Sequence, residues 1–124
     1  MTPSLIPALV GSLLALIAVQ FTLVGLGVFA ASWAWPVHRA VGSAFLLPLA
    51  GLAWIVWRNP ALRPLRRPVA LVAGIYAMQF AWLGLGRLTD LAEIQALHAL
   101  GGLALAGVTD ALFRAARRSP ASIA

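Results

Sequence analysis

Residues 40–57 read AVGSAFLLPLAGLAWIVW, and no charged side chain interrupts them between Arg39 and Arg58. Their length is close to the roughly 20 apolar residues that a helix needs to cross a bilayer. Pro48 should kink this helix, because proline cannot donate the hydrogen bond to the Ala44 carbonyl. The sequence therefore predicts an all-α membrane protein, a bundle of four transmembrane helices. The three further spans are expected at residues 5–28, 68–86 and 94–114.

The composition supports a membrane protein and excludes other classes. Hydrophobic residues make up 62% of the 124-residue chain and charged residues 10%, against roughly 45–50% and 25% in soluble domains. Too few charged groups are present to build the polar surface of a soluble domain. The chain has no cysteine, which excludes disulfides, iron–sulfur clusters and covalently attached c-type haem.

The connections between the spans are expected to be loops. Residues 30–37 carry Trp33 and Trp35, which suit the aromatic belt at a membrane interface. Residues 58–68 read RNPALRPLRRP, and their prolines and arginines favour a second loop. Residues 87–95 are expected to form a polar connector on the same side as the first loop.

The arginines predict how the chain lies in the membrane. Only Arg39 and Arg87 lie on the side of the first and third connectors. Positive charge favours the cytoplasmic side, so both termini are expected in the cytoplasm. We expect a multi-pass protein of a bacterial or archaeal inner membrane, with the lipid bilayer and not nucleic acid as its partner. The seven arginines on the opposite, cytoplasmic side are Arg58, Arg63, Arg66, Arg67, Arg114, Arg117 and Arg118.

The two halves of the chain resemble each other. The offset is 59 residues in the first helix of each half and 60 in the second. This predicts one domain, residues 1–124, built from two parallel two-helix repeats at about 5–58 and 68–118. The pairs that carry the repeat are Gln20 and Gln79, Gly25 and Gly84, Gly27 and Gly86, His38 and His98, and Gly42 and Gly102.

His38 and His98 are the only histidines of the chain, and the repeat places them at equivalent depth. In a ring of four sequential helices the second and fourth spans are diagonal, with axes about 11–14 Å apart. That distance suits two imidazoles that bind one metal from opposite sides at about 2 Å each. We therefore predict non-covalent haem b with His38 and His98 as its metal ligands. The alternatives are two interfacial polar residues, or an isolated zinc or copper site.

Other residues are expected to complete the haem site. Gly42 and Gly102 lie one turn from the histidines and could leave space for the macrocycle, as could the glycines of the flanking helices. The alternative for these glycines is close helix packing. Gln20 and Gln79 are expected to hydrogen-bond each other, the cofactor edge or neighbouring helices.

Arg39 and Arg87 lie near the outer ends of their spans and are expected within reach of the haem propionates, since arginine pairs well with carboxylates. The alternative is that both guanidinium groups are solvated at the membrane interface.

Over residues 19–114 the chain resembles one half of haem A synthase. The features that carry this resemblance are four spans, a histidine that opens the second and fourth, a glutamine and glycine in the preceding helix, and the dipeptide His38-Arg39. The resemblance implies a four-helix bundle with a histidine pair on its second and fourth helices. The family has a catalytic acid three residues before the histidine, and here Trp35 and Gln95 occupy those positions. The second bundle of the family is also missing.

Three functions follow from these observations. The leading one is a bis-histidine haem b protein for electron transfer or haem handling. The second is a haem-free accessory subunit of a larger membrane complex. The third is a haem A synthase-like enzyme that acts as a homodimer, which the missing acid disfavours.

The predicted topology can be tested with reporter fusions. A reporter fused at Ala124 should report the cytoplasm and one inserted near Asp90 the opposite side, because seven arginines favour the cytoplasmic face. Activity of alkaline phosphatase and fluorescence of green fluorescent protein at each position give the measurement. Reports from the same side at both positions would contradict the four-span topology.

Overall fold

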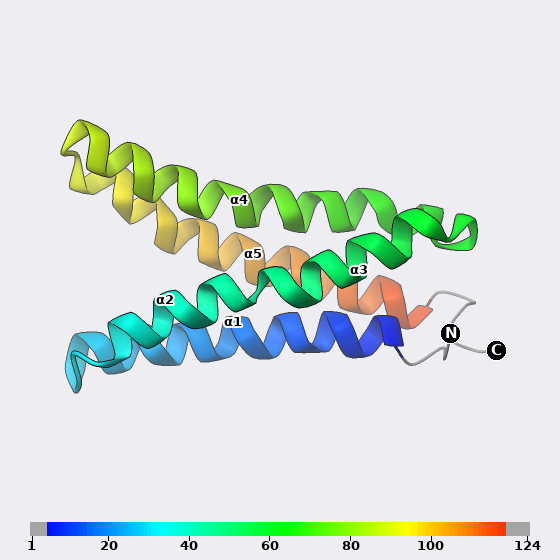
Figure 1. Cartoon of the computed structure of the whole chain (residues 1–124), viewed down its shortest axis with the longest axis horizontal. Helices are drawn as coiled ribbons and strands as arrows, with labels where there is room; N and C mark the ends of the chain where they lie inside the picture. Colours follow the sequence, from blue (N-terminus) through cyan, green and yellow to red (C-terminus); the bar gives the residue numbers. More distant parts are fainter. Residues whose placement is uncertain (1–4, 119–124) are drawn as a thin grey trace.

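The computed structural model describes residues 5–118, so the first four and last six residues of the predicted domain 1–124 lie outside it. The described residues contain helices and no strand. The elements are α1 (Leu5–Phe29), α2 (Ala34–Ala44), α3 (Leu46–Arg58), the 3₁₀ helix η1 (Pro60–Leu65), α4 (Arg66–Thr89) and α5 (Ala92–Arg118) (Figure 1).

Four helical segments are long and apolar enough to cross a membrane. α1 and α5 each form one segment, α2 and α3 together form another, and η1 continues into α4 as the remaining one. The chain is therefore an all-α, multi-pass membrane protein, as the sequence predicts. Helices suit this environment because they satisfy their own backbone hydrogen bonds where no water is available.

The boundary between α2 and α3 lies at Phe45, within the second span. Pro48 follows three residues later and has no N–H to donate to the Ala44 carbonyl. The Phe45 N–H still bonds to the Val41 carbonyl at 3.2 Å, so the chain continues in the same direction. Phe45 keeps helical backbone angles, so the span runs on as one helical segment, Ala34–Arg58, and the predicted kink at Pro48 stays a prediction.

The prediction of a loop at residues 58–68 was wrong. Pro60–Leu65 forms the 3₁₀ helix, and α4 already begins at Arg66. The Asn59 side chain accepts a hydrogen bond from the Ala61 N–H at 3.0 Å and starts the turn. Pro60 and Pro68 are tolerated because each lies in the first turn of its helix, where N–H groups are unpaired, whereas Pro64 lies inside η1.

The other two predicted connectors are also shorter than expected. α2 begins at Ala34, so Trp35 and His38 lie within a helix, and Pro36 is accommodated in its first turn. Only Asp90 and Leu91 separate α4 from α5. Asp90 adopts a left-handed conformation with φ 55°, which ends α4 in a tight turn.

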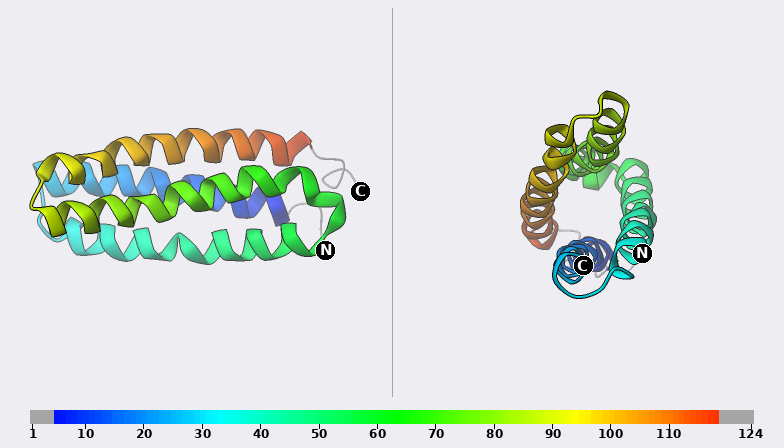
Figure 2. Two further views of the ribbon diagram at one scale, coloured as in Figure 1. Left: turned by 90° about the horizontal axis from the view of Figure 1, so that it is seen from above. Right: turned by 90° about the vertical axis from the view of Figure 1, so that its left-hand side faces the viewer.

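The four spans form a ring in chain order, visible when the bundle is viewed along its axis (Figure 2). α1 packs against α2, α3 and α5, and α4 packs against α3 and α5. α2 and α5 therefore lie on a diagonal. η1, the start of α1 and the end of α5 lie at one end of the bundle, and the other two connections lie at the opposite end (Figure 1).

The hydrophobic core lies in the half of the bundle nearest η1. In the opposite half, Ala34 is the one buried residue of α2, and residues 92–104 of α5 include none that is buried. The half of the bundle that contains the connections 30–33 and Asp90–Leu91 is thus loosely filled by side chains. The buried core side chains are Val10, Leu13, Ile17, Phe45, Leu49, Leu52, Val56, Leu62, Leu65, Val69, Val72, Leu105, Leu112 and Ala116.

The position of the core predicts which apolar substitutions matter. Leu52→Ala should lower the free energy of unfolding by on the order of 2 kcal/mol, because Leu52 is 0% exposed and its loss leaves a cavity. Leu47→Ala, at a side chain that is 76% exposed, is the matched control and should have little effect, since lipid fills the space. Unfolding of both variants in sodium dodecyl sulfate, followed by circular dichroism, gives the comparison. Equal losses at both positions would contradict the assigned core.

Candidate functional site

His38 on α2 and His98 on α5 face each other across the bundle. Both side chains are partly buried, and their ring centroids are 6.2 Å apart with an angle of 76° between the ring planes. The helices α2 and α5 are diagonal in the bundle and do not pack as neighbours. The two imidazole side chains therefore meet near the centre of the bundle. The sequence expectation that both histidines point into one core is met by this arrangement.

Each histidine is associated with the glutamine of its own half. Nδ1 of His98 lies 3.3 Å from the backbone carbonyl of Gln79. The backbone of Gln20 lies near the His38 imidazole. Nδ1 of His38 is buried and has no hydrogen-bond partner of standard geometry. An Nδ1–H directed at a carbonyl leaves Nε2 as the ring nitrogen that can bind a metal.

The glutamine side chains contact backbone rather than each other. Nε2 of Gln20 donates to the carbonyl of His38 at 2.9 Å, which joins α1 to α2. Nε2 of Gln79 donates to the Ile75 carbonyl within α4 at 3.4 Å. The Oε1 atoms of both glutamines are buried and have no hydrogen-bond partner. Together with Nδ1 of His38, three buried polar atoms beside the histidines therefore lack a partner.

The glycines nearest the histidines make room for the glutamine amides. A Cβ atom on Gly42 would lie 3.0 Å from Nε2 of Gln20. In the second half the equivalent contact is made by Gly101, whose Cβ would collide with the Gln79 amide. Gly102, the predicted partner of Gly42, faces Phe21 instead, at 3.7 Å from its Cζ atom. The space expected for a macrocycle beside Gly42 is thus occupied by an amide.

Among the flanking glycines, Gly27 and Gly86 serve helix packing and do not leave open space. A Cβ on Gly27 would lie 2.7 Å from the indole of Trp35. A Cβ on Gly86 would collide with the Gln95 side chain and lie 3.0 Å from its backbone nitrogen. Each contact closes one helical hairpin near its connection. Gly25 and Gly84 have no atom within 4 Å of a Cβ position and are the two that remain open.

Arg39 and Arg87 are exposed, and neither guanidinium group makes a hydrogen bond or ion pair with another of the residues 5–118. Arg39 follows His38 on α2. Arg87 lies in the last turn of α4. Both stand at the histidine end of the bundle, and their predicted pairing with propionates remains a prediction.

Tyr76 adds a contact beside the histidine pair that the sequence pattern does not indicate. Its hydroxyl donates to the Gly42 carbonyl at 3.0 Å and so joins α4 to α2 one turn from His38. Its ring stacks on Phe45 at 4.9 Å and meets Phe80 edge-on at 5.2 Å. Trp35 was also missed, since its ring lies 6.1 Å from that of His38. Only the one-turn spacing of Trp35 and His38 could have indicated this contact.

No cluster of three or more His, Cys, Asp or Glu side chains that could hold a metal occurs within residues 5–118. A closed metal site built only from protein ligands, as for structural zinc, needs about four. A metal that brings most of its own ligands, as haem iron does, needs only one or two side chains.

Comparison with known proteins gives one finding. A family described as a family of unknown function (DUF6220) matches residues 20–85, which include Gln20, His38, Gly42 and Gln79. No curated protein and no solved structure matches the chain. The resemblance to haem A synthase gains no support from this match and stays a prediction.

The glycine contacts predict a difference between neighbouring positions. Gly86→Ala should lower the free energy of unfolding by about 1–3 kcal/mol, because the new methyl group meets the backbone of α5 as well as Gln95. Gly84→Ala, two residues away with open space around it, should cause no loss. Thermal unfolding in detergent measures both. A Gly86→Ala protein as stable as the wild type would show that the hairpin is not closed by this contact.

Proposed function

The chain belongs to a family of unknown function (DUF6220), and we propose that it is a haem b-binding membrane protein with His38 and His98 as the two axial ligands. Its role is electron transfer or haem handling. The proposal keeps the predicted setting, a bacterial or archaeal inner membrane with both termini in the cytoplasm. The chain acts as a single four-helix domain, alone, as a homodimer or within a larger membrane complex.

The observation that carries the proposal is the 6.2 Å between the imidazole centroids. Two imidazoles on opposite sides of one metal, each with a metal–nitrogen bond of about 2 Å, have centroids roughly 6 Å apart. The perpendicular arrangement of the rings, at 76°, is compatible with axial ligation, because each ring rotates freely about its own metal bond.

The surroundings of the histidines also support a haem site. The Gln79 carbonyl faces Nδ1 of His98, and such a contact fixes the tautomer and the orientation of a ligating ring. The half of the bundle that holds the histidines has few buried side chains, so the chain does not fill it with its own core. Three buried polar atoms beside the rings lack partners, which is typical of a site that has a further occupant.

The residues that replace the catalytic acid of haem A synthase have structural contacts here. Trp35 covers Gly27, and Gln95 covers Gly86. Neither side chain can act as a carboxylate base. The proposal therefore favours electron transfer or haem handling over hydroxylation, and the homodimeric enzyme remains the less supported alternative.

When bound, haem supplies one-electron exchange at iron. The chain supplies the two imidazoles and excludes water through the apolar side chains of the spans. Two protein ligands leave no open coordination position, which disfavours oxygen chemistry. Arg39, which follows His38 on α2, would stabilise acidic groups at the same end of the bundle.

The proposal predicts the spectra of histidine variants. The full-length protein from haem-replete cells should carry one low-spin haem b per chain. His38→Ala and His98→Ala should each lose haem or give a high-spin spectrum, and the double variant should bind none, because each substitution removes one axial ligand. Absorption spectra of oxidised and reduced protein, with haem content per chain, give the measurement.

Thr109→Ala is the matched control, because Thr109 is a fully buried polar residue of α5 in the opposite half of the bundle. Its haem content should equal that of the wild type. An unchanged low-spin spectrum in either single histidine variant would exclude that histidine as a ligand. A colourless wild-type protein would overturn the proposal and favour the haem-free accessory subunit.

A further inference from the structure

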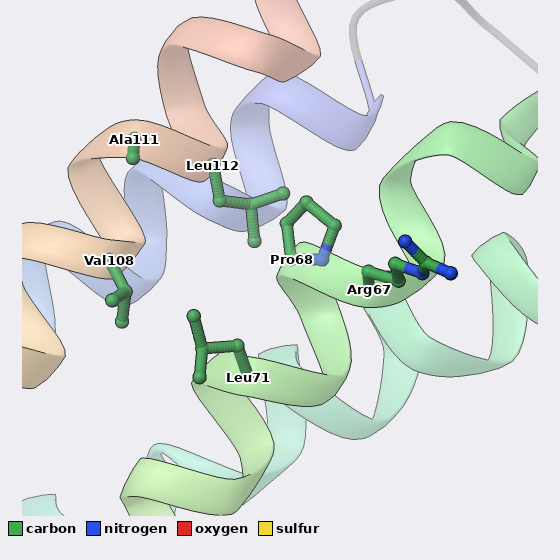
Figure 3. A pocket seen from close by; sticks show the side chains of 6 residues that line it. All are labelled: Arg67, Pro68, Leu71, Val108, Ala111 and Leu112. Carbon is green, nitrogen blue, oxygen red and sulfur yellow. The ribbon is translucent and has the colours of Figure 1, made fainter.

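A groove lies between α4 and α5 in the half of the bundle opposite the histidines (Figure 3). It has a volume of about 350 Å³. Apart from Arg67 at one end, all the side chains that line it are apolar. They are Pro68 and Leu71 of α4, and Val108, Ala111 and Leu112 of α5.

The groove faces the bilayer and not the interior of the bundle. Leu71 is 53% exposed, and Ala111 is also exposed. The segment of α4 from Arg67 to Leu71 is about 6 Å long, because a helix rises 1.5 Å per residue. The groove therefore begins at the arginine-rich membrane interface and continues into the hydrocarbon region. This geometry suits a molecule with an anionic end and an apolar chain.

Arg67 is available to such a molecule, whereas its neighbour Arg66 is not. The Arg66 guanidinium donates to the Trp57 carbonyl at 2.9 Å and to the Val56 carbonyl at 3.4 Å, which caps the end of α3. The Arg67 guanidinium makes no hydrogen bond or ion pair with another residue of the described range 5–118. One arginine of this pair is used within the fold, and the guanidinium of the other is exposed beyond Pro68 at the end of the groove, directed away from the apolar lining (Figure 3).

The acidic residue closest in sequence to the lining does not cancel this charge. Asp110, which precedes Ala111 on α5, forms an ion pair with Arg114 one turn later. The local balance at the rim is therefore positive. An anionic headgroup at Arg67 meets no unpaired carboxylate from the lining residues of either helix.

From these observations we propose that the groove binds an anionic phospholipid of the surrounding bilayer. One acyl chain lies against Leu71, Val108 and Ala111, and the phosphate pairs with Arg67. Phospholipid headgroups lie at the depth of the arginine-rich interface, and basic pockets between membrane helices on this side bind anionic headgroups in general. This site is distinct from the histidine pair and does not depend on haem.

Native mass spectrometry of the full-length protein in detergent tests the proposal. The probes are phosphatidylglycerol and phosphatidylcholine with identical acyl chains. The wild type should retain one phosphatidylglycerol in preference to phosphatidylcholine. Arg67→Gln should weaken phosphatidylglycerol retention about fivefold and remove the preference, as expected for the loss of one arginine–headgroup interaction. Ala111→Phe should fill the groove and reduce retention of both lipids.

Arg63→Gln is the matched control, since it removes the same charge from η1 at the same end of the bundle without lining the groove. It should leave the bound phosphatidylglycerol in place. Circular dichroism establishes that each variant is folded. Equal retention of the two lipids by the wild type, or equal losses in Arg67→Gln and Arg63→Gln, would overturn the proposal in favour of non-specific charge attraction.

Discussion

The hydrocarbon region of a bilayer offers no partner to a backbone N–H or C=O group, and the structure depends on this constraint. It explains why the connections Asp90–Leu91 and 30–33 are so short, and why even the proline-rich segment after Arg58 winds into η1. It also gives the few buried polar side chains unusual weight. A polar side chain between such helices is stabilised by a hydrogen-bond partner, and the partners of Gln20, Tyr76 and Gln79 are backbone carbonyls.

The two halves of the bundle are held together in different ways. Near η1, interlocked apolar side chains fill the interior, and Arg66 caps α3 through two carbonyls. Near the histidines the contacts are few and specific. They are the Gln20 amide on α2, the Tyr76 hydroxyl on α2, and the close approaches at Gly27 and Gly86. A half that is tied by a few polar contacts and not filled by side chains is the part of the bundle suited to a ligand.

Much of this architecture could be predicted from the sequence. Charge-free intervals such as 40–57 locate the spans because charges are costly in lipid. The uniqueness and matched depth of His38 and His98 predicted their approach. The sequence could not predict that Gly101, and not Gly102, lies against the Gln79 amide. The 59-residue offset pairs Gly42 with Gly101 and the 60-residue offset pairs it with Gly102. These adjacent residues point about 100° apart on the helix. The contacts of Trp35 and Gln95 were missed because both were interpreted as departures from a motif and not as packing residues.

The position of α2 beyond the apolar core has a consequence for the histidine pair. Leu49, Leu52 and Val56 anchor α3 in the apolar core. Phe45 keeps helical backbone angles, so α2 continues from α3, and further contacts hold α2 beyond the core. Gln20 of α1 binds its His38 carbonyl, and Tyr76 of α4 binds its Gly42 carbonyl, one turn apart and from different neighbours. Two hydrogen bonds from two helices help to fix the position and the rotation of α2. The orientation of His38 towards His98 is therefore supported by polar contacts around α2 in addition to the packing of α3 in the apolar core.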